Sequence, residues 1–308
     1  MTDILEDSWL TAARTAIGDA SLELLASEAD SATLLVTRYG DDRTVLKAAR
    51  ESDGKLASLR SQWDALWLLS ENPDFPGPRP LARHNLEHEI EAIEISYLPG
   101  RHPEFDSDQD FRLFGETIAR LHAVSKERTL AGAVIWDLQR IARHYDDARL
   151  LRLMSKEEKR IAVQALERFG SRFQGYIDSS IWTGLLHSDS HRHNVVIEDG
   201  RGSLIDFGES GFGPLFWDLG VAIADSVIDD PERGEACRRN LLSGYTSVLP
   251  QTAAILADDL RIFEAMRSLE VMTWPVSDWS EQQFEEDKDD AIENIGLSCE
   301  HLETLLAY

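Results

Sequence analysis

The sequence is poor in cysteine and in basic residues, and each shortage excludes a class of protein. Only Cys237 and Cys299 occur among 308 residues. They are too few for a disulfide framework and too far apart for the spacing of a zinc site. Lys and Arg number 31 against 56 Asp and Glu, so the formal net charge is −25. Because nucleic acid and anionic membranes repel such a chain, neither is expected as a partner.

Long apolar runs are also missing. No stretch approaches the roughly 20 apolar residues that cross a bilayer, and the acidic start MTDILEDSW lacks the basic and then apolar pattern of a signal peptide. We therefore expect a cytoplasmic protein, either a monomer or a homodimer. The length and a hydrophobic content of 43% allow a large core, and they favour two lobes over one compact sheet.

The first part of the chain has a mostly strand-like pattern. Two such runs at 33–39 and 43–48 are separated by the turn-forming residues 40–42, which predicts a hairpin. Apolar residues then recur at three- and four-residue spacing over 56–70, which predicts a helix. The helix should end at the Pro- and Gly-rich stretch 72–80.

The pattern changes from alternating to helical shortly before residue 110. Alternation over 93–97 predicts a strand that ends at Leu98-Pro99-Gly100. Apolar residues at helical spacing over 111–121 predict the next helix, and further helices are expected at about 133–148 and 155–174. The second part of the chain is therefore expected to be mainly α-helical.

A short β-rich segment at 185–207 interrupts the helical part, and helical patterns then resume to the end of the chain. We therefore expect a small β-rich domain at residues 1–98. A larger, mainly helical domain should follow at residues 99–308.

The β-rich segment carries three side chains suited to phosphate chemistry. Two short strands at 195–197 and 204–205 should bring Asp189, Asn194 and Asp206 near one another. Phosphoryl transfer from ATP needs a carboxylate that orients the attacking hydroxyl, and it needs oxygen ligands that hold Mg²⁺ against the phosphates. These three side chains supply those groups.

The order of these residues resembles the catalytic core of the aminoglycoside phosphotransferase and choline kinase family. That family carries His-x-Asp-x-x-x-x-Asn, a hairpin, Asp-Phe or Asp-Trp, and Gly-x-Pro-x-x-x-Asp-Leu. This chain has the three blocks in the same order, at 187–194, 206–207 and 213–219. The resemblance implies an α+β, two-lobed protein-kinase-like fold, with a small β-rich N-terminal lobe and a larger, mainly α C-terminal lobe. It also implies an ATP-dependent kinase that phosphorylates a hydroxyl of a small molecule.

The resemblance assigns a role to each of five residues in the second lobe. Asp189 would orient the acceptor hydroxyl or accept its proton, and Asn194 and Asp206 would bind Mg²⁺. His187 would support the loop. Asp218 would hold the same loop through hydrogen bonds from the start of the next helix.

The first lobe resembles the family in two further places. Lys47, in Thr44-Val45-Leu46-Lys47, matches the strand lysine that contacts the α- and β-phosphates of ATP. The stretch from Ile95 to Gly100 matches the hinge, where backbone groups near Ser96 and Leu98 would hydrogen-bond adenine.

Three positions depart from the family pattern. The turn at 28–32 has no glycine, which argues against a close backbone cradle for phosphates there. The helix after Lys47 offers Gln62 or Asp64 where a glutamate is expected to pair with the lysine. Ser188 replaces a frequent glycine.

The end of the chain is strongly acidic. Residues 268–308 contain eleven acidic residues and a single lysine. An acidic wall that includes Glu285, Glu286 and Asp287 would attract a cationic, amine-bearing acceptor. The alternative is a solvated surface that promotes solubility. Among the family's acceptors, which include aminoglycosides and other antibiotics, homoserine and amino alcohols, the sequence does not choose.

Three other functions compete with a small-molecule kinase. A catalytically inactive kinase-like binding module would keep the fold without turnover. A serine/threonine protein kinase would need an activation segment, and no such segment fits between Asp206-Phe207 and Gly213. Finally, His187, Asp189, His191 and His193 alternate like transition-metal ligands, as in a metal hydrolase.

Overall fold

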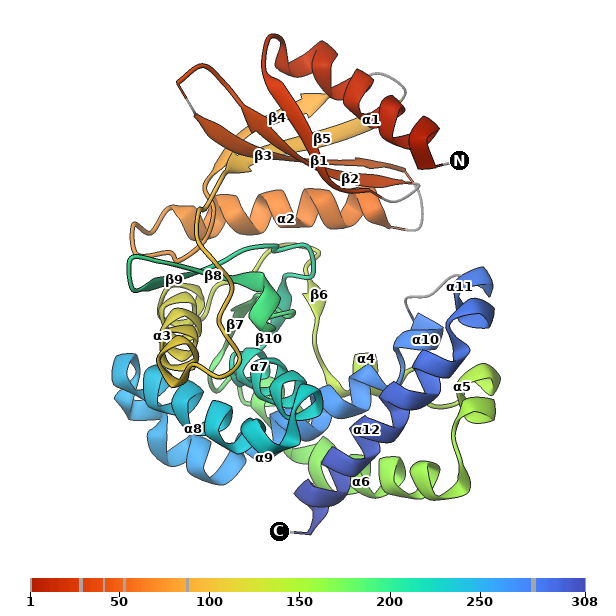
Figure 1. The fold of residues 1–308 in the computed structure, drawn as a ribbon. Coiled ribbons are helices and arrows are strands. Elements are labelled where there is room, and N and C mark those ends of the chain that lie inside the picture. Colours follow the sequence, from red (N-terminus) through yellow and green to blue (C-terminus); the bar gives the residue numbers. More distant parts are fainter. Residues whose placement is uncertain are drawn as a thin grey trace.

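The computed structural model describes residues 2–27, 30–40, 42–51, 54–86, 89–277 and 281–307. The N-terminal part forms a five-stranded antiparallel sheet with the strand order β1-β2-β3-β5-β4. The sheet lies at one end of the molecule, and the helical part lies at the other (Figure 1). The strands are β1 (Ser21–Ser27), β2 (Ser31–Thr37), β3 (Arg43–Arg50), β4 (Pro80–Asn85) and β5 (Ile90–Ser96).

Two helices cover the opposite faces of this sheet (Figure 1). Helix α1 (Thr2–Ile17) buries Trp9 against Leu34 of β2 in a small core of its own. Helix α2 (Lys55–Ser70) packs on the other face, and Leu59 joins the main core of the protein. The central strands are therefore covered on both faces, whereas β1 and β4 at the edges keep exposed residues.

The alternation of side chains along β3 aims Lys47 at α2. Leu46 and Ala48 belong to the core under α1, whereas Val45 and Ala49 pack in the core on the α2 side. Because successive side chains of a strand point to opposite faces, Lys47 lies on the face that α2 covers. The predicted hairpin of β2 and β3 and the predicted helix over 56–70 are confirmed.

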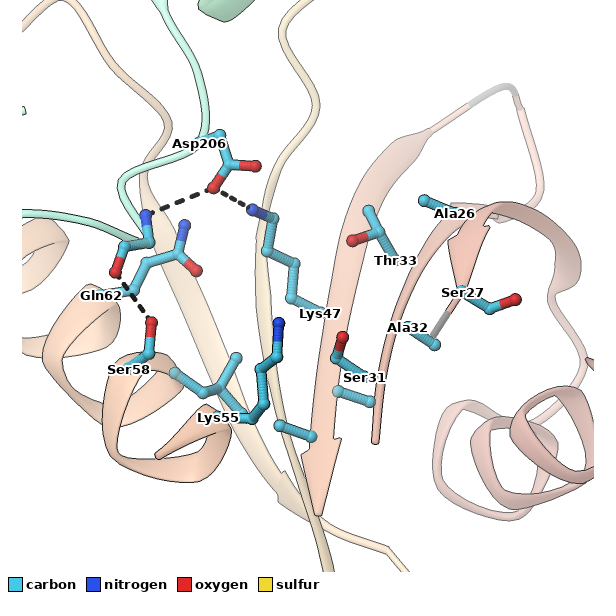
Figure 2. A pocket seen from close by; sticks show the side chains of 14 residues that line it. Ala26, Ser27, Ser31, Ala32, Thr33, Lys47, Lys55, Ser58, Gln62 and Asp206 are labelled. Atoms are coloured by element: carbon cyan, nitrogen blue, oxygen red, sulfur yellow. Dashed lines mark hydrogen bonds and ion pairs between the residues drawn. The ribbon is translucent and has the colours of Figure 1, made fainter. Parts of the chain in front are cut away.

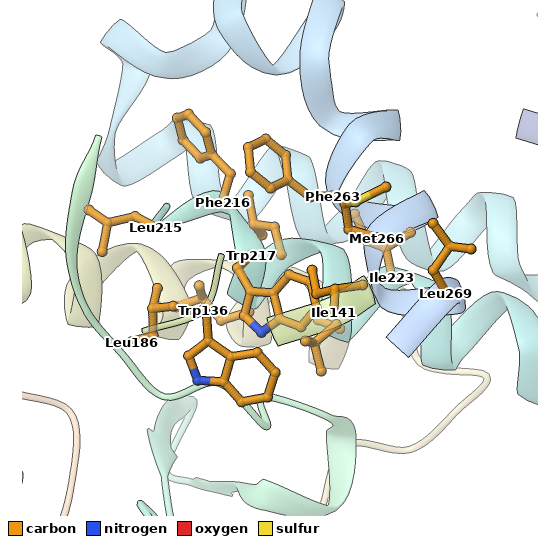
Figure 3. Close-up of a cluster of buried hydrophobic side chains, with 14 of the residues drawn as sticks. Trp136, Ile141, Leu186, Leu215, Phe216, Trp217, Ile223, Phe263, Met266 and Leu269 are labelled. Carbon is orange, nitrogen blue, oxygen red and sulfur yellow. The ribbon is translucent and has the colours of Figure 1, made fainter. Parts of the chain in front are cut away.

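The C-terminal part is mainly α-helical, as expected. Its core surrounds the stacked rings of Trp136 and Trp217, whose centroids lie 5.1 Å apart (Figure 3). Helix α7 begins at Phe216, so the core is built directly beneath the loops that precede this helix. The helices are α3 (Asp108–Ser125), α4 (Leu138–Ala142), α5 (Ala148–Leu153), α6 (Lys156–Asp178), α7 (Phe216–Asp229), α8 (Pro231–Val248), α9 (Ala253–Val271), α10 (Trp274–Ser277), α11 (Glu281–Glu286) and α12 (Lys288–Leu306).

Short strands lie between the sheet and the helices. One group has the order β6-β10-β7, and β8 pairs with β9 as an antiparallel hairpin. Two 3₁₀ turns complete the part of the fold that the structure describes. These elements are β6 (Val134–Ile135), β7 (Thr183–Leu186), η1 (Arg192–Asn194), β8 (Val195–Glu198), β9 (Arg201–Leu204), β10 (Gly211–Pro214) and η2 (Pro250–Thr252).

Some predicted elements are wrong or were missed. The helix expected at 133–148 is instead strand β6 followed by the short helices α4 and α5. The backbone N–H of Trp136 donates to Phe212 O, because β6 pairs in parallel with β10. This tertiary pairing overrides the local helical pattern. The pattern analysis also missed α1 and β4.

Within the part of the chain that the structure describes, no helix is both long enough and apolar enough to span a membrane.

The contact between α3 and α8 gives a test of the packing. A Cβ atom at Gly115 of α3 would lie 2.0 Å from Leu241 O, a backbone atom of α8. We expect Gly115→Ala to lower the free energy of unfolding by roughly 2 kcal/mol or more, because the helices must move apart. Gly175→Ala is the control, since a Cβ at Gly175 of α6 has no neighbour within 4 Å. It should stabilise the protein by roughly 0.5–1 kcal/mol. Urea unfolding measures both, and a Gly115→Ala protein as stable as the parent would contradict this packing.

Candidate active site

The buried carboxylate of Asp218 holds the loop that carries the predicted site residues. Asp218 lies in the first turn of α7 and is fully buried. Its Oδ2 accepts from the backbone N–H of His187 at 3.0 Å, and its Oδ1 accepts from that of Ser188 at 2.8 Å. His122 Nε2 of α3 also donates to it, at 3.1 Å. Asp218 is thus bonded to the loop that the sequence predicts it to hold.

The buried His122 continues this network to helix α8. A carboxylate only accepts hydrogen bonds, so His122 Nε2 carries a proton and donates to Asp218. The hydroxyl of Tyr245 forms a hydrogen bond of 2.8 Å with the other ring nitrogen, Nδ1. One chain of hydrogen bonds therefore ties α3 and α8 to Asp218.

Ser188 has an unusual backbone conformation that the Asp218 contact stabilises. Its φ is +72°, in the left-handed region that favours glycine. Glycine adopts this conformation without strain, which explains why the family frequently has glycine at this position. A serine there carries some backbone strain, which the hydrogen bond to Asp218 helps to offset.

The loop places Asp189 and Asn194 in direct contact. Asn194 Nδ2 donates to Asp189 Oδ2 at 2.9 Å and to the carbonyl oxygen of the same residue at 2.8 Å. The backbone N–H of Ile205 donates to Asn194 O, and His187 Nε2 donates to Ile205 O at 2.8 Å. The loop at 187–194, the predicted catalytic loop, is thereby joined to Ile205, the residue that precedes Asp206.

Asp206 forms an ion pair with Lys47 across the two parts of the fold. Lys47 Nζ donates to Asp206 Oδ1 at 2.6 Å, and the backbone N–H of Gly208 lies 3.3 Å from the same oxygen. Burial alone would raise the pKa of Asp206, but the charge and the hydrogen bond of Lys47 outweigh it and lower the pKa. The carboxylate is therefore ionised at neutral pH.

This ion pair lies in a cavity of about 410 Å³ between the sheet, α2 and the loop after Asp206 (Figure 2). Gln62 of α2 is buried and lines the cavity, whereas Asp64 is exposed and does not. Of the two candidates for the glutamate position, Gln62 is the one that faces Lys47. The glycine-free turn contributes Ser31 and Ala32 to the same cavity, while its Glu28 and Ala29 lie outside the described residues.

The predicted hinge residues lie at the end of β5, away from this ion pair. The backbone N–H of Ser96 donates to Arg79 O at 2.9 Å, and the backbone N–H of Arg79 donates to Ser96 Oγ at 2.8 Å. The N–H of Ser96 is therefore already used within the protein. Leu98 is half-buried just beyond the strand. Neither residue lines the cavity around Lys47.

Arg267 of α9 contacts Asp189, although no sequence motif points to it. Its guanidinium is buried and makes two 3.0 Å hydrogen bonds to Asp225 and one of 2.8 Å to Glu270. It lies 3.7 Å from Asp189 Oδ1 and over the ring of Trp274. Burial would lower the pKa of Arg267, but Asp225 and Glu270 raise it, so the guanidinium stays charged.

The charge state of Asp189 follows from these neighbours. Burial would raise its pKa, but the hydrogen bond with His191 and the charge of Arg267 hold the pKa well below its usual range. Asp189 is therefore a carboxylate throughout the neutral pH range.

A second cavity, of about 250 Å³, borders the loop at His191, Arg192 and His193. Its wall includes His191, Asp225, Trp274 and Asn294. The predicted acidic contacts are not part of this wall. Glu285 and Glu286 are exposed, Asp287 is half-exposed, and Asp278 lies outside the described residues.

The described residues contain no group of three or more His, Cys, Asp or Glu side chains that could hold a metal ion. The alternating residues of the catalytic loop diverge, since His187 donates to Ile205 O while His191 contacts Asp189. A transition-metal hydrolase site is therefore not supported by the described part of the chain.

The Asp218 network predicts a graded loss of stability. In Asp218→Asn, an amide NH₂ replaces one oxygen and faces a backbone N–H, so we expect a loss of roughly 3 kcal/mol. Tyr245→Phe leaves only His122 Nδ1 without its hydrogen-bond partner, and it should cost roughly 1–2 kcal/mol. Urea unfolding at neutral pH measures both losses. Equal stability of Asp218→Asn and the parent would mean that the carboxylate does not hold the loop.

Several solved structures have the same fold. One is a microcompartment-associated aminopropanol kinase, 23% identical over 97% of this chain and 98% of that chain, with a TM-score of 0.73. Another is the amicoumacin kinase hAmiN in complex with AMP-PNP, Ca²⁺ and Ami, 15% identical over 97% of this chain and 93% of that chain, with a TM-score of 0.67. A third is a thermostable mutant of aminoglycoside phosphotransferase APH(4)-Ia with AMP-PNP and hygromycin B, 15% identical over 96% and 98%, with a TM-score of 0.62.

These likenesses confirm the expected two-lobed α+β fold of the kinase type. A search of curated proteins gave no match to the sequence. The model of the phosphotransferase enzyme family, however, matches residues 21–255, which include the sheet, the catalytic loop and Asp218. The resemblance inferred from the three sequence blocks is thus confirmed, and the chain belongs to the phosphotransferase enzyme family.

Proposed function

We propose that this protein transfers the terminal phosphoryl group of ATP to a hydroxyl of a small, amine-bearing molecule. One observation carries the proposal. Asp189 and Asn194 touch each other, while Asp206, joined to the same loop through Ile205, pairs with Lys47 from the opposite sheet. Carboxylate, amide and ammonium groups thus lie at one boundary between the two parts of the fold. Phosphoryl transfer needs this set of groups.

Asp189 is proposed as the catalytic carboxylate. Its lowered pKa makes it a weak base at neutral pH, so its main task is to accept a hydrogen bond from the acceptor hydroxyl and to orient it. The proton passes to Asp189 late, once the hydroxyl oxygen has begun to bond to phosphorus. Arg267 and His191 keep the carboxylate ionised for this task.

Asn194 and Asp206 are proposed to bind Mg²⁺. The fit rests on the donor set, because Mg²⁺ prefers oxygen ligands and usually takes only one or two from protein, the rest coming from phosphates and water. Asp206 is ionised, and Asn194 uses its Nδ2 on Asp189, which leaves its amide oxygen to bind a cation. When bound, Mg²⁺ neutralises phosphate charge. Lys47 bonds to Oδ1 of Asp206, so Oδ2 would be the oxygen that holds the ion, and Lys47 would exchange Oδ1 for a phosphate oxygen.

Residues 1–98 are proposed to form the nucleotide-binding lobe, and residues 99–308 the lobe with the catalytic loop and the acceptor site. Two of the similar structures contain AMP-PNP, an ATP analogue, and one of these also contains Ca²⁺. The cavity around Lys47 is the proposed place of the phosphates. Adenine would then reach the hinge, where Leu98 offers a backbone N–H and Ser96 only its carbonyl.

The acceptor is proposed to carry an amine. The similar structures are kinases of aminopropanol, amicoumacin and aminoglycosides. In this chain, the cavity beside the catalytic loop has Asp225 in its wall. Glu285, Glu286 and Asp287 lie near the start of α12, the helix that contributes Asn294 to the same cavity. Their proposed role is to attract a cationic acceptor from a distance, since they do not line the cavity.

The competing functions are weaker. An inactive binding module would not need two linked pairs of polar residues at this place. Here Lys47 pairs with Asp206, and Asn194 pairs with Asp189. A protein kinase needs an activation segment of some 20–30 residues, whereas β10 already begins at Gly211.

Asp189→Asn separates chemistry from nucleotide binding. We expect a fall in turnover of roughly 100-fold or more, with the affinity for ATP within a few-fold of the parent, because only the orienting carboxylate is lost. Steady-state kinetics and calorimetry measure the two effects. Retained turnover would remove Asp189 from the mechanism.

Asp206→Ala should abolish magnesium-dependent binding of ATP, because the variant lacks the ionised ligand. Calorimetric titrations with and without Mg²⁺ measure this. Asp199→Ala, in the turn between β8 and β9, is the control and should bind like the parent. Unchanged magnesium-dependent binding in Asp206→Ala would exclude this residue as the ligand.

The proposed attraction of the acceptor predicts a dependence on salt. Exposed charges are screened over roughly 8 Å at physiological ionic strength. Neutralising Glu285, Glu286 and Asp287 together should raise the Michaelis constant of the acceptor at low salt, and the difference from the parent should vanish by about 0.5 M salt. The constant for ATP should change less. If the triple variant and the parent have the same constant at low salt, these residues form only a solvated surface.

A further inference from the structure

The side-chain amide of Gln62 is a buried polar group that the roles above leave unused. Gln62 lies in α2 and is 2% exposed. Figure 2 shows its amide next to the Lys47–Asp206 ion pair, in the wall of the same cavity. Among the described residues, its Nε2 has no hydrogen-bond partner. A buried donor without an acceptor lowers stability, so its retention in a cavity wall needs an explanation.

The amide does not replace a glutamate as the ionic partner of Lys47. An ionised glutamate only accepts hydrogen bonds, whereas the Nε2 of glutamine only donates them. Lys47 already pairs with Asp206. Glutamine keeps one acceptor oxygen but is neutral, so at this position the chain loses the ionic partner and gains a hydrogen-bond donor, Nε2, that glutamate lacks.

We propose that Gln62 Nε2 donates a hydrogen bond to a phosphate oxygen of the bound nucleotide. Lys47 and Lys55 line the same cavity, so a ligand rich in anionic oxygens suits this wall. The amide nitrogen is shielded from solvent. A phosphate oxygen therefore reaches it only when side chains that line the same cavity, among them Lys47 and Asp206, change position as the nucleotide binds. The inference rests on the proposed function of this cavity.

Gln62→Met tests the donor, because methionine has a similar size and no amide. Calorimetric titration in the presence of Mg²⁺ should show ATP binding roughly tenfold or more weakly than to the parent, as expected for a hydrogen bond to a charged acceptor. Adenosine, which has no phosphate, should bind as it does to the parent. Unchanged ATP affinity, or an equal loss for ATP and adenosine, would overturn the proposal.

Gln62→Glu tests the alternative that this position serves Lys47. A carboxylate here repels phosphate and cannot donate, so ATP should bind at least as weakly as to Gln62→Met. If Gln62→Glu binds ATP as well as the parent or better, the position is an ionic partner of the lysine and the proposal is wrong.

The unfolding temperature gives a readout that does not depend on binding. Without nucleotide, Gln62→Met should unfold at or above the temperature of the parent, because it removes an unpartnered buried donor. Saturating ATP should then raise this temperature less than it does for the parent. A large loss of stability without nucleotide would show that the amide has a structural role, which contradicts the proposal.

Asp64→Asn is the matched control on the same helix. Asp64 is exposed and does not line the cavity, so this variant should bind ATP like the parent. A loss equal to that of Gln62→Met would mean that α2 acts as a whole and not through the amide. If the parent itself fails to bind ATP, the proposed function fails together with this inference. If the parent binds ATP and Gln62→Met binds it equally well, only the inference about Gln62 fails.

Discussion

The buried carboxylate of Asp218 is the interaction on which the site depends. It accepts from two successive backbone N–H groups of the catalytic loop and from His122. Its place in the first turn of α7 suits a negative charge, because the N-terminus of a helix is the positive end of the helix dipole. The loop geometry follows from these bonds. Ser188 takes a left-handed conformation, and the next residue, Asp189, emerges beside Asn194.

Two polar contacts join β3 and α2 to the segment at 206–208. Lys47 pairs with Asp206, whose side chain is 51% exposed, and Ser58 Oγ of α2 donates to Gly208 O. Because Asp206 is half exposed, water screens the pair and limits its contribution to stability. A ligand that offers phosphate to Lys47 and a cation to Asp206 would replace both partners of the pair. The weakness of this pair thus fits the proposed function.

Sequence and structure agree where a feature is local. The alternation around Lys47 predicted its strand, and the two short strands predicted after Asn194 are present as the hairpin of β8 and β9. Asn194 contacts Asp189, and it bonds to Ile205, the residue before Asp206. Features that depend on tertiary contacts were missed. Strand β6 exists because it pairs with β10, and Arg267 reaches Asp189 only because α9 packs against α7. Neither contact can be predicted from the spacing of residues in the sequence.

The central claim is that this protein transfers the terminal phosphoryl group of ATP to a hydroxyl of a small amine-bearing molecule. The most direct measurement is ³¹P NMR of the products formed from ATP and Mg²⁺ with amino alcohols and aminoglycosides, each tested separately. The account predicts a new phosphate monoester that appears only when one such acceptor is present, together with an equal amount of ADP. Phosphate that appears only as free phosphate, or only on serine residues of a protein substrate, would contradict it.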